Sequence, residues 1–157
     1  MKVHVLTEDT YGREFIRKLT NRLKYESFIE RDINIEVTRY NIYKIKSIIK
    51  TSLIAYDKII VFIDCDGECL EGSAELISRE IDKQKSNNVT QIKFRWEIED
   101  WLCVSYGFPI EREKSSIVMK KKKDYKKFQL PKYVDKLDIK KLKSLSDTFS
   151  AFLKALK

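Results

Sequence analysis

The chain has 157 residues, which is enough for one well-buried domain and too few for two domains of ordinary size. Hydrophobic residues make up 43% of it, with only 4 glycines and 2 prolines, a composition typical of a folded protein built from long regular elements. No apolar run approaches the roughly 20 residues that span a bilayer, and the first residues lack the apolar stretch of a signal peptide. We therefore expect a cytoplasmic protein that does not enter a membrane.

The net charge of +8 is unevenly distributed along the chain. From Lys114 to the last residue there are 14 lysines and 4 aspartates, a net charge of +10, whereas the preceding residues have a net charge of −2. This segment would attract a polyanion such as nucleic acid, and the interleaved Tyr125 and Phe128 could stack on bases; a solvated charge run is the alternative. The lysines that lie closest together are Lys120, Lys121, Lys122, Lys123, Lys126 and Lys127.

The hydrophobic pattern predicts strands and helices that alternate along the first two thirds of the chain. Short apolar runs predict the strands, and apolar residues three or four apart predict the helices. Strands that alternate with helices form parallel βαβ units, so we expect an α/β, three-layer, Rossmann-like domain with about four mostly parallel strands. In chain order we expect a strand at 2–7, a helix at 11–28, a strand at 33–37, a helix at 42–53, a strand at 58–64, a helix at 70–81, a strand at 89–96 and a helix at 97–106.

The last part of the chain has a different pattern. Residues 111–130 are polar and basic, and we expect them to form a long basic loop or lid. Residues 131–157 contain leucines and phenylalanines at helical spacing, which predicts a helical extension whose amphipathic last helix docks on the sheet. We expect these segments and the α/β part to form a single domain, residues 1–157.

The chain has an odd number of cysteines, and no two of them form a CxxC pair. They are Cys65, Cys69 and Cys103. Neither a disulfide framework nor a zinc site is indicated by this spacing. We expect all three to be reduced and to behave as small hydrophobic residues.

Acidic residues follow three of the predicted strands at the point where each strand ends. The carboxyl ends of parallel strands meet at one edge of a sheet, where like charges are costly unless a cation or a proton intervenes. Each cluster could also simply start a helix, where carboxylates favour the helix dipole. Carboxylate oxygens suit hard divalent cations, so we expect a site for Mg²⁺ or Mn²⁺. The candidate ligands are Glu8 and Asp9 after the first strand, Asp64 and Asp66 after the third, and Glu97 and Glu99 after the fourth.

With these clusters the chain resembles the Toprim domain, in which a glutamate follows the first strand and Asp-x-Asp follows the third. It is also similar to small stand-alone Toprim-like proteins of archaea and bacteria that are associated with restriction and defence loci. Their later signature, an acidic residue before Trp-Leu, is matched by Glu99-Asp100-Trp101-Leu102. Many Toprim domains have glycine directly after the first glutamate, whereas this chain has Asp9. Whether Glu8 or Asp9 faces the metal therefore stays open.

The resemblance implies a metal-dependent nuclease that hydrolyses phosphodiester bonds in DNA or RNA. Asp64 and Asp66 would hold the metal, Glu8 would act as general acid/base or as a further ligand, and Glu97 or Glu99 would complete the site. Arg95 and the clustered lysines would contact the phosphate backbone. The chain has no GxxxxGK[ST] motif, so a separate ATPase or defence protein is a candidate partner.

Two other functions are compatible with the sequence. The first is a non-catalytic module that binds nucleic acid or a protein in a defence or toxin–antitoxin system. The second is a response-regulator-like phosphoacceptor with Asp64 as the acceptor, which requires a lysine after a fifth strand. The sequence contains no convincing fifth strand.

Overall fold

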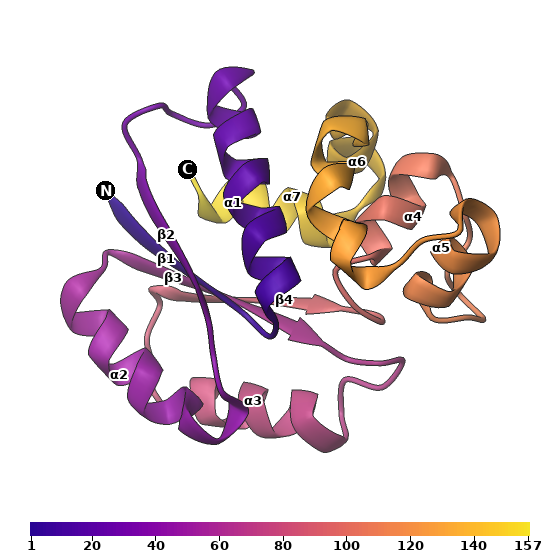
Figure 1. Cartoon of the computed structure of the whole chain (residues 1–157). Helices are drawn as coiled ribbons and strands as arrows, with labels where there is room; N and C mark the ends of the chain where they lie inside the picture. Colours follow the sequence, from indigo (N-terminus) through magenta and orange to yellow (C-terminus); the bar gives the residue numbers. More distant parts are fainter.

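The computed structural model describes residues 1–157, and at its centre four parallel strands lie in the order β2-β1-β3-β4 (Figure 1). The two inner strands, β1 and β3, are buried along almost their whole length because helices cover both faces of the sheet. The predicted α/β class and parallel sheet are confirmed, and the arrangement is consistent with a Rossmann-like fold. The strands are β1 (Lys2–Thr7), β2 (Asn34–Arg39), β3 (Lys58–Asp64) and β4 (Val89–Phe94).

Helices cover the two faces of the sheet in separate layers (Figure 1). One layer contains α1 (Thr10–Tyr25) and α7 (Asp147–Ala155). The other contains α2 (Ile45–Ala55) and α3 (Gly72–Asp82), and α2 is preceded by the short 3-10 helix η1 (Ile42–Lys44). Each layer has its own hydrophobic core, and none of the helices has the length and apolar character that crossing a membrane requires.

The last helix, α7, packs on β3 and β4 beside α1, as its amphipathic pattern predicted. Its Phe149 and Phe152 meet Trp101, with ring centroids 5.0 and 5.5 Å apart. Trp101 is fully buried and also contacts Phe94 of β4 at 5.1 Å. Aromatic pairs of this kind each contribute about 0.5–1.5 kcal/mol beyond the burial of their area. This cluster joins the C-terminal segment to the sheet.

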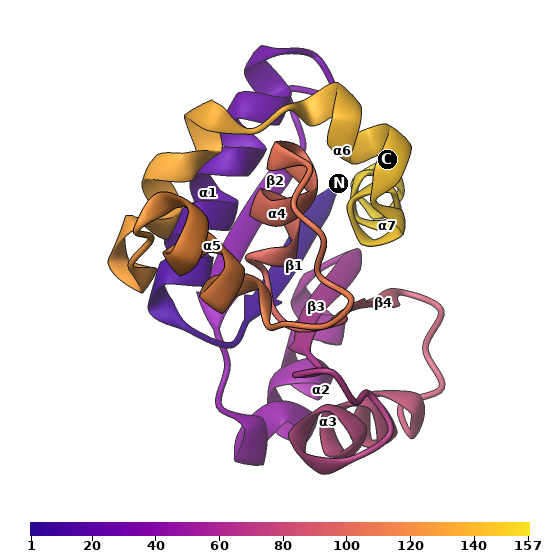
Figure 2. The same cartoon turned by 90° about the vertical axis from the view of Figure 1, so that its right-hand side faces the viewer.

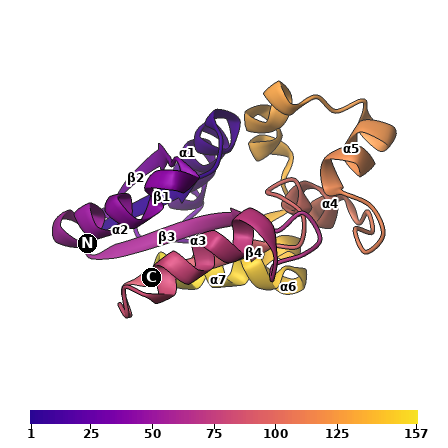
Figure 3. The same cartoon turned by 90° about the horizontal axis from the view of Figure 1, so that it is seen from below.

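The segment between β4 and α7 gathers beyond the carboxyl ends of the strands, which Figure 2 shows from that side and Figure 3 from below. The expected loop at 111–130 was wrong, because Ser115–Lys123 and the residues from Lys127 onward are helical. Apolar residues recur between its lysines, and Met119, Tyr125 and Leu130 are buried. The elements are α4 (Asp100–Tyr106), α5 (Ser115–Lys123), the 3-10 helix η2 (Lys127–Lys136), which packs along α1, and α6 (Ile139–Leu145).

The strand order places a topological switch between β1 and β3. The chain passes from β1 to β2 on one side and then returns to β3 on the other side of β1. In open α/β sheets, ligands bind in the crevice beyond the carboxyl ends of the strands at such a point. Glu8 follows β1 directly and Asp64 is the last residue of β3, so both lie at this position. The sheet has no fifth strand, which the phosphoacceptor alternative requires.

Candidate active site at the carboxyl ends of the strands

Glu8 and Asp64 lie at the switch point, at the ends of the adjacent strands β1 and β3. Burial, followed by the hydrogen bond to Glu8 and its charge, raises the pKa of Asp64 to about 10. Asp64 therefore holds a proton at neutral pH. Beside it, the Tyr40 hydroxyl donates a hydrogen bond of 2.8 Å to the carbonyl of Phe62. Burial and the charges of Glu8 and Asp64 raise the pKa of Tyr40, so this phenol stays neutral.

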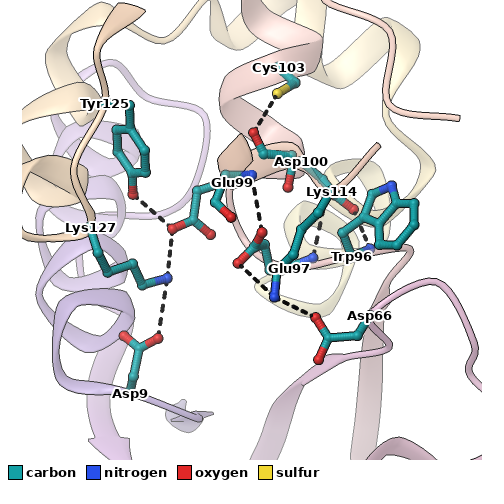
Figure 4. A network of polar contacts seen from close by, with 12 residues as sticks. Asp9, Asp66, Trp96, Glu97, Glu99, Asp100, Cys103, Lys114, Tyr125 and Lys127 are labelled. Atoms are coloured by element: carbon teal, nitrogen blue, oxygen red, sulfur yellow. Dashed lines mark hydrogen bonds and ion pairs between the residues drawn. The ribbon is translucent and has the colours of Figure 1, made fainter. Parts of the chain in front are cut away.

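Glu99 lies fully buried before α4 and carries the second part of the site (Figure 4). Its Oε1 accepts hydrogen bonds from the Tyr125 hydroxyl at 2.7 Å and from the Lys127 ammonium at 2.6 Å. The same ammonium lies 3.3 Å from Asp9 Oδ2. Glu99 Oε2 has no hydrogen-bond partner. Burial raises the pKa of Glu99, and Lys127 opposes that rise.

The third part of the site is an ion-pair cluster around Lys114 (Figure 4). Its ammonium lies 2.9 Å from Asp66 Oδ1 and 3.7 Å from Glu97 Oε1. The hydrogen bond to Asp66 raises the pKa of Lys114, and the charge of Glu97 adds to this effect. Glu97 Oε2 also accepts a hydrogen bond of 3.1 Å from the Ser116 N–H. Lys114 therefore links the turn after β3 to the segment after β4.

The turn that carries Asp66 is held against the end of β4. Asp66 and Gly67 both have positive φ angles, 49° and 92°. Their N–H groups donate to the carbonyls of Trp96 and Arg95, at 3.1 and 2.7 Å. A Cβ on Gly67 would lie 2.7 Å from the Trp96 ring, so the position requires glycine for space as well as for its backbone angle.

Cys65 and Cys69 form a disulfide that closes this turn, so the expectation that they are reduced was wrong. The left-handed residues Asp66 and Gly67 reverse the chain and bring the two Cα atoms to 4.6 Å, which is within disulfide range. Cys103 is free and buried, as expected, and burial raises its pKa to about 12.

Some of the acidic residues also start helices, as the alternative interpretation held. Asp9 is the N-cap of α1 and accepts a hydrogen bond of 2.6 Å from the Gly12 N–H. Asp100 accepts one of 3.1 Å from the Trp96 N–H. Glu99, at the N-cap position of α4, makes no capping hydrogen bond, so a capping role does not explain its burial.

The predicted metal ligands come to one edge of the sheet but divide into three groups. Asp64 pairs with Glu8, whereas lysine ammonium groups lie between the other carboxylates: Lys127 between Asp9 and Glu99, and Lys114 between Asp66 and Glu97. No three of the histidine, cysteine, aspartate and glutamate side chains are grouped so that they could hold a metal ion. The sequence interpretation missed Lys114 and Tyr40, because nothing in their local pattern separates them from other lysines and tyrosines. Tyr125, which was expected to be able to stack on bases, is instead buried and donates its hydroxyl hydrogen bond to Glu99.

The basic residues lie on α5 and beside it. Positive charge in the last turn of a helix is favourable, because the helix dipole is negative there. Lys121 pairs with Glu113, and Lys123 lies 4.7 Å from the centre of the Tyr106 ring. Arg95 lies 5.6 Å from the centre of the Trp96 ring. Of the predicted phosphate-binding residues, those exposed to solvent are Arg95, Lys120, Lys121, Lys122, Lys123 and Lys126. Lys127 is half-buried between Glu99 and Asp9.

The fold and the site define an α/β protein with an acidic edge that its own lysines partly neutralise. Comparisons of the chain with protein-family models, with curated proteins and with solved structures find no match. A functional proposal for this chain therefore depends on its own residues and their arrangement.

Proposed function

We propose that the protein is a metal-dependent nuclease of Toprim type that hydrolyses phosphodiester bonds in DNA or RNA with Mg²⁺ or Mn²⁺. The observation that carries the proposal is the position of Glu8 and Asp64 at the ends of adjacent strands, at the switch point of the sheet. Two carboxyl groups come from adjacent strand ends there, and a hard divalent cation can replace the proton that Asp64 holds at neutral pH. The resemblance assigns the same two positions to the first glutamate and the first aspartate of the Toprim motif.

The residues of the site fit a metal in part. Glu8 and Asp64 supply two carboxylates, and Asp66 would be the third ligand. Asp66 is paired with Lys114, so a metal would compete with Lys114 for Asp66 and with the proton for Asp64. A bound Mg²⁺ or Mn²⁺ would supply positive charge to a phosphoryl oxygen and make a bound water more acidic.

The side chains of the chain itself would move the proton and hold the substrate. Glu8 lines an open pocket, so its carboxylate can exchange a proton with water or with a substrate oxygen. If a metal displaces Lys114 from Asp66, the ammonium of Lys114 would be free to contact a phosphate at the same edge of the sheet. The exposed lysines of α5 would hold the phosphate backbone. A partner ATPase or defence protein belongs to the same proposal.

A nuclease assay with matched variants tests the proposal. Wild-type protein with Mn²⁺ should nick DNA or RNA, and Glu8→Gln and Asp64→Asn should each lose about 100- to 10,000-fold in rate. Glu30→Gln is the matched control, because Glu30 is exposed and precedes β2 at the opposite edge of the sheet. If Glu30→Gln loses as much activity as Glu8→Gln, or if EDTA leaves the cleavage unchanged, the proposal fails.

One observation favours a second function, a module that binds nucleic acid without cleaving it. Lys114 and Lys127 already neutralise much of the acidic edge, and no three carboxylates are grouped for a metal. The binding module predicts no cleavage with any divalent metal, together with salt-dependent binding. Replacing Lys120, Lys121, Lys122 and Lys123 by glutamine should then flatten the plot of log affinity against log salt by about 0.7–0.9 for each phosphate that the variant no longer neutralises.

A further inference from the structure

A pocket of about 610 Å³ opens beside the Glu8–Asp64 pair, between the end of β2 and the start of α3. Its volume lies in the range of sites for small ligands, roughly 300–1,000 Å³. Only 2 of its 6 lining residues are hydrophobic, so it suits a polar ligand. The lining residues are Glu8, Arg39, Tyr40, Asn41, Ile42 and Ser73.

The positive charge in the pocket comes from Arg39, the last residue of β2. Arg39 is exposed and takes part in none of the ion pairs of the chain, unlike Arg13, Arg17, Arg22 and Arg79. A free guanidinium binds phosphate through two parallel hydrogen bonds. An anionic group of a ligand would therefore meet Arg39.

The other walls of the pocket determine how a ligand would be oriented. Ser73 offers a hydroxyl at the first turn of α3, whose N-cap residue, Glu71, makes no side-chain capping bond. Glu8 repels a phosphate but accepts a hydrogen bond from a hydroxyl. A ligand that fits has a phosphate toward Arg39 and Ser73 and a hydroxyl toward Glu8.

We infer that this pocket binds one nucleotide unit, with its phosphate on Arg39 and a sugar hydroxyl on Glu8. The inference takes its substrate class from the proposed nuclease function and places the substrate strand on the β2 side of the site. The pocket shares Glu8 with the Glu8–Asp64 pair, so a nucleotide bound there lies next to the groups proposed to act on it.

Calorimetric titration with AMP in EDTA tests the inference without metal or cleavage. Wild-type protein should bind AMP, and Arg39→Gln should weaken the binding at least about tenfold, because the phosphate loses its charge-assisted hydrogen bonds to the guanidinium. Arg31→Gln is the matched control, since Arg31 is exposed and precedes β2 at the opposite edge of the sheet. In NMR spectra, AMP should shift the amide signals of Asn41 and Ser73.

Three results would overturn the inference: no AMP binding up to about 10 mM, equal weakening by Arg31→Gln and Arg39→Gln, or equal affinity for AMP and for adenosine. The nuclease assay is independent of this titration. Cleavage without AMP binding would support the proposed nuclease function and contradict the nucleotide-binding inference. AMP binding that requires Arg39, without cleavage, would support the nucleotide-binding inference and contradict the nuclease function.

Discussion

Replacing Asp64 by asparagine is expected to stabilise the folded protein at neutral pH. Burial and the neighbouring Glu8 raise the pKa of Asp64 from its ordinary value of 3.8 to about 10. Between these values the folded chain binds one more proton than the unfolded chain, so this contribution to stability decreases as pH rises. It is fully present below pH 3.8 and is lost progressively up to about pH 10.

The size of the effect follows from the same pKa shift. At pH 7 an unfolded aspartate is ionised, while the half-buried Asp64 of the folded chain stays protonated. The difference between pH 7 and its ordinary pKa is about 3 units, which corresponds to an upper limit of about 4 kcal/mol. Asparagine is neutral in both states, and its amide can donate a hydrogen bond to Glu8. We expect a gain of about 1–4 kcal/mol, or roughly 2–4 °C in Tm for each kcal/mol.

Urea unfolding at pH 4, 7 and 9 measures this gain. The difference between Asp64→Asn and wild type should be close to zero at pH 4 and should grow at each higher pH. Asp32→Asn, at an exposed position before β2, is the control and should change stability by less than about 0.5 kcal/mol. A gain that does not vary with pH, or a loss at pH 7, would refute the inference that Asp64 holds a proton in the folded state.

Two further predictions concern residues near Glu8 and Asp64. Lys127→Gln should lower the free energy of unfolding by about 1–3 kcal/mol, because it leaves the buried Glu99 without its cation. Adding Glu99→Gln should restore part of this stability, and urea unfolding that shows no restoration would contradict the prediction. Gly67→Ala should cost roughly 1 kcal/mol or more beyond Gly72→Ala, because only at Gly67 would a Cβ meet Trp96; equal destabilisation in thermal unfolding would argue against that clash.

The sequence determined the elements whose signals are local. The apolar run before Asp64 predicts a strand buried on both faces, and β3 is such a strand. The helix expected at 97–106 ends at Tyr106, and Gly107 follows it at the C-cap with a φ of 78°. Such signals need only the periodicity of neighbouring side chains, and the parallel sheet then brings the strand ends together at one edge.

Local pattern was less reliable where charge dominated the composition or where two segments had to meet. The lysine run around α5 led to the prediction of a loop, although the apolar side chains of Val118 and Met119 pack in the core and hold this segment as a helix. The disulfide between Cys65 and Cys69 depended on the left-handed turn between them, and their spacing alone did not indicate it.

The tertiary structure alone decided which charges meet at the acidic edge. The Lys127 ammonium reaches Glu99 from 28 residues along the chain. Lys114 likewise reaches back from the segment after β4 to Asp66 in the turn after β3. Any of the other lysines carries the same charge, so composition could place positive charge in this part of the chain without assigning a partner. The packing of α5 and η2 beyond the strand ends brings these two lysines, and not their neighbours, to the carboxylates.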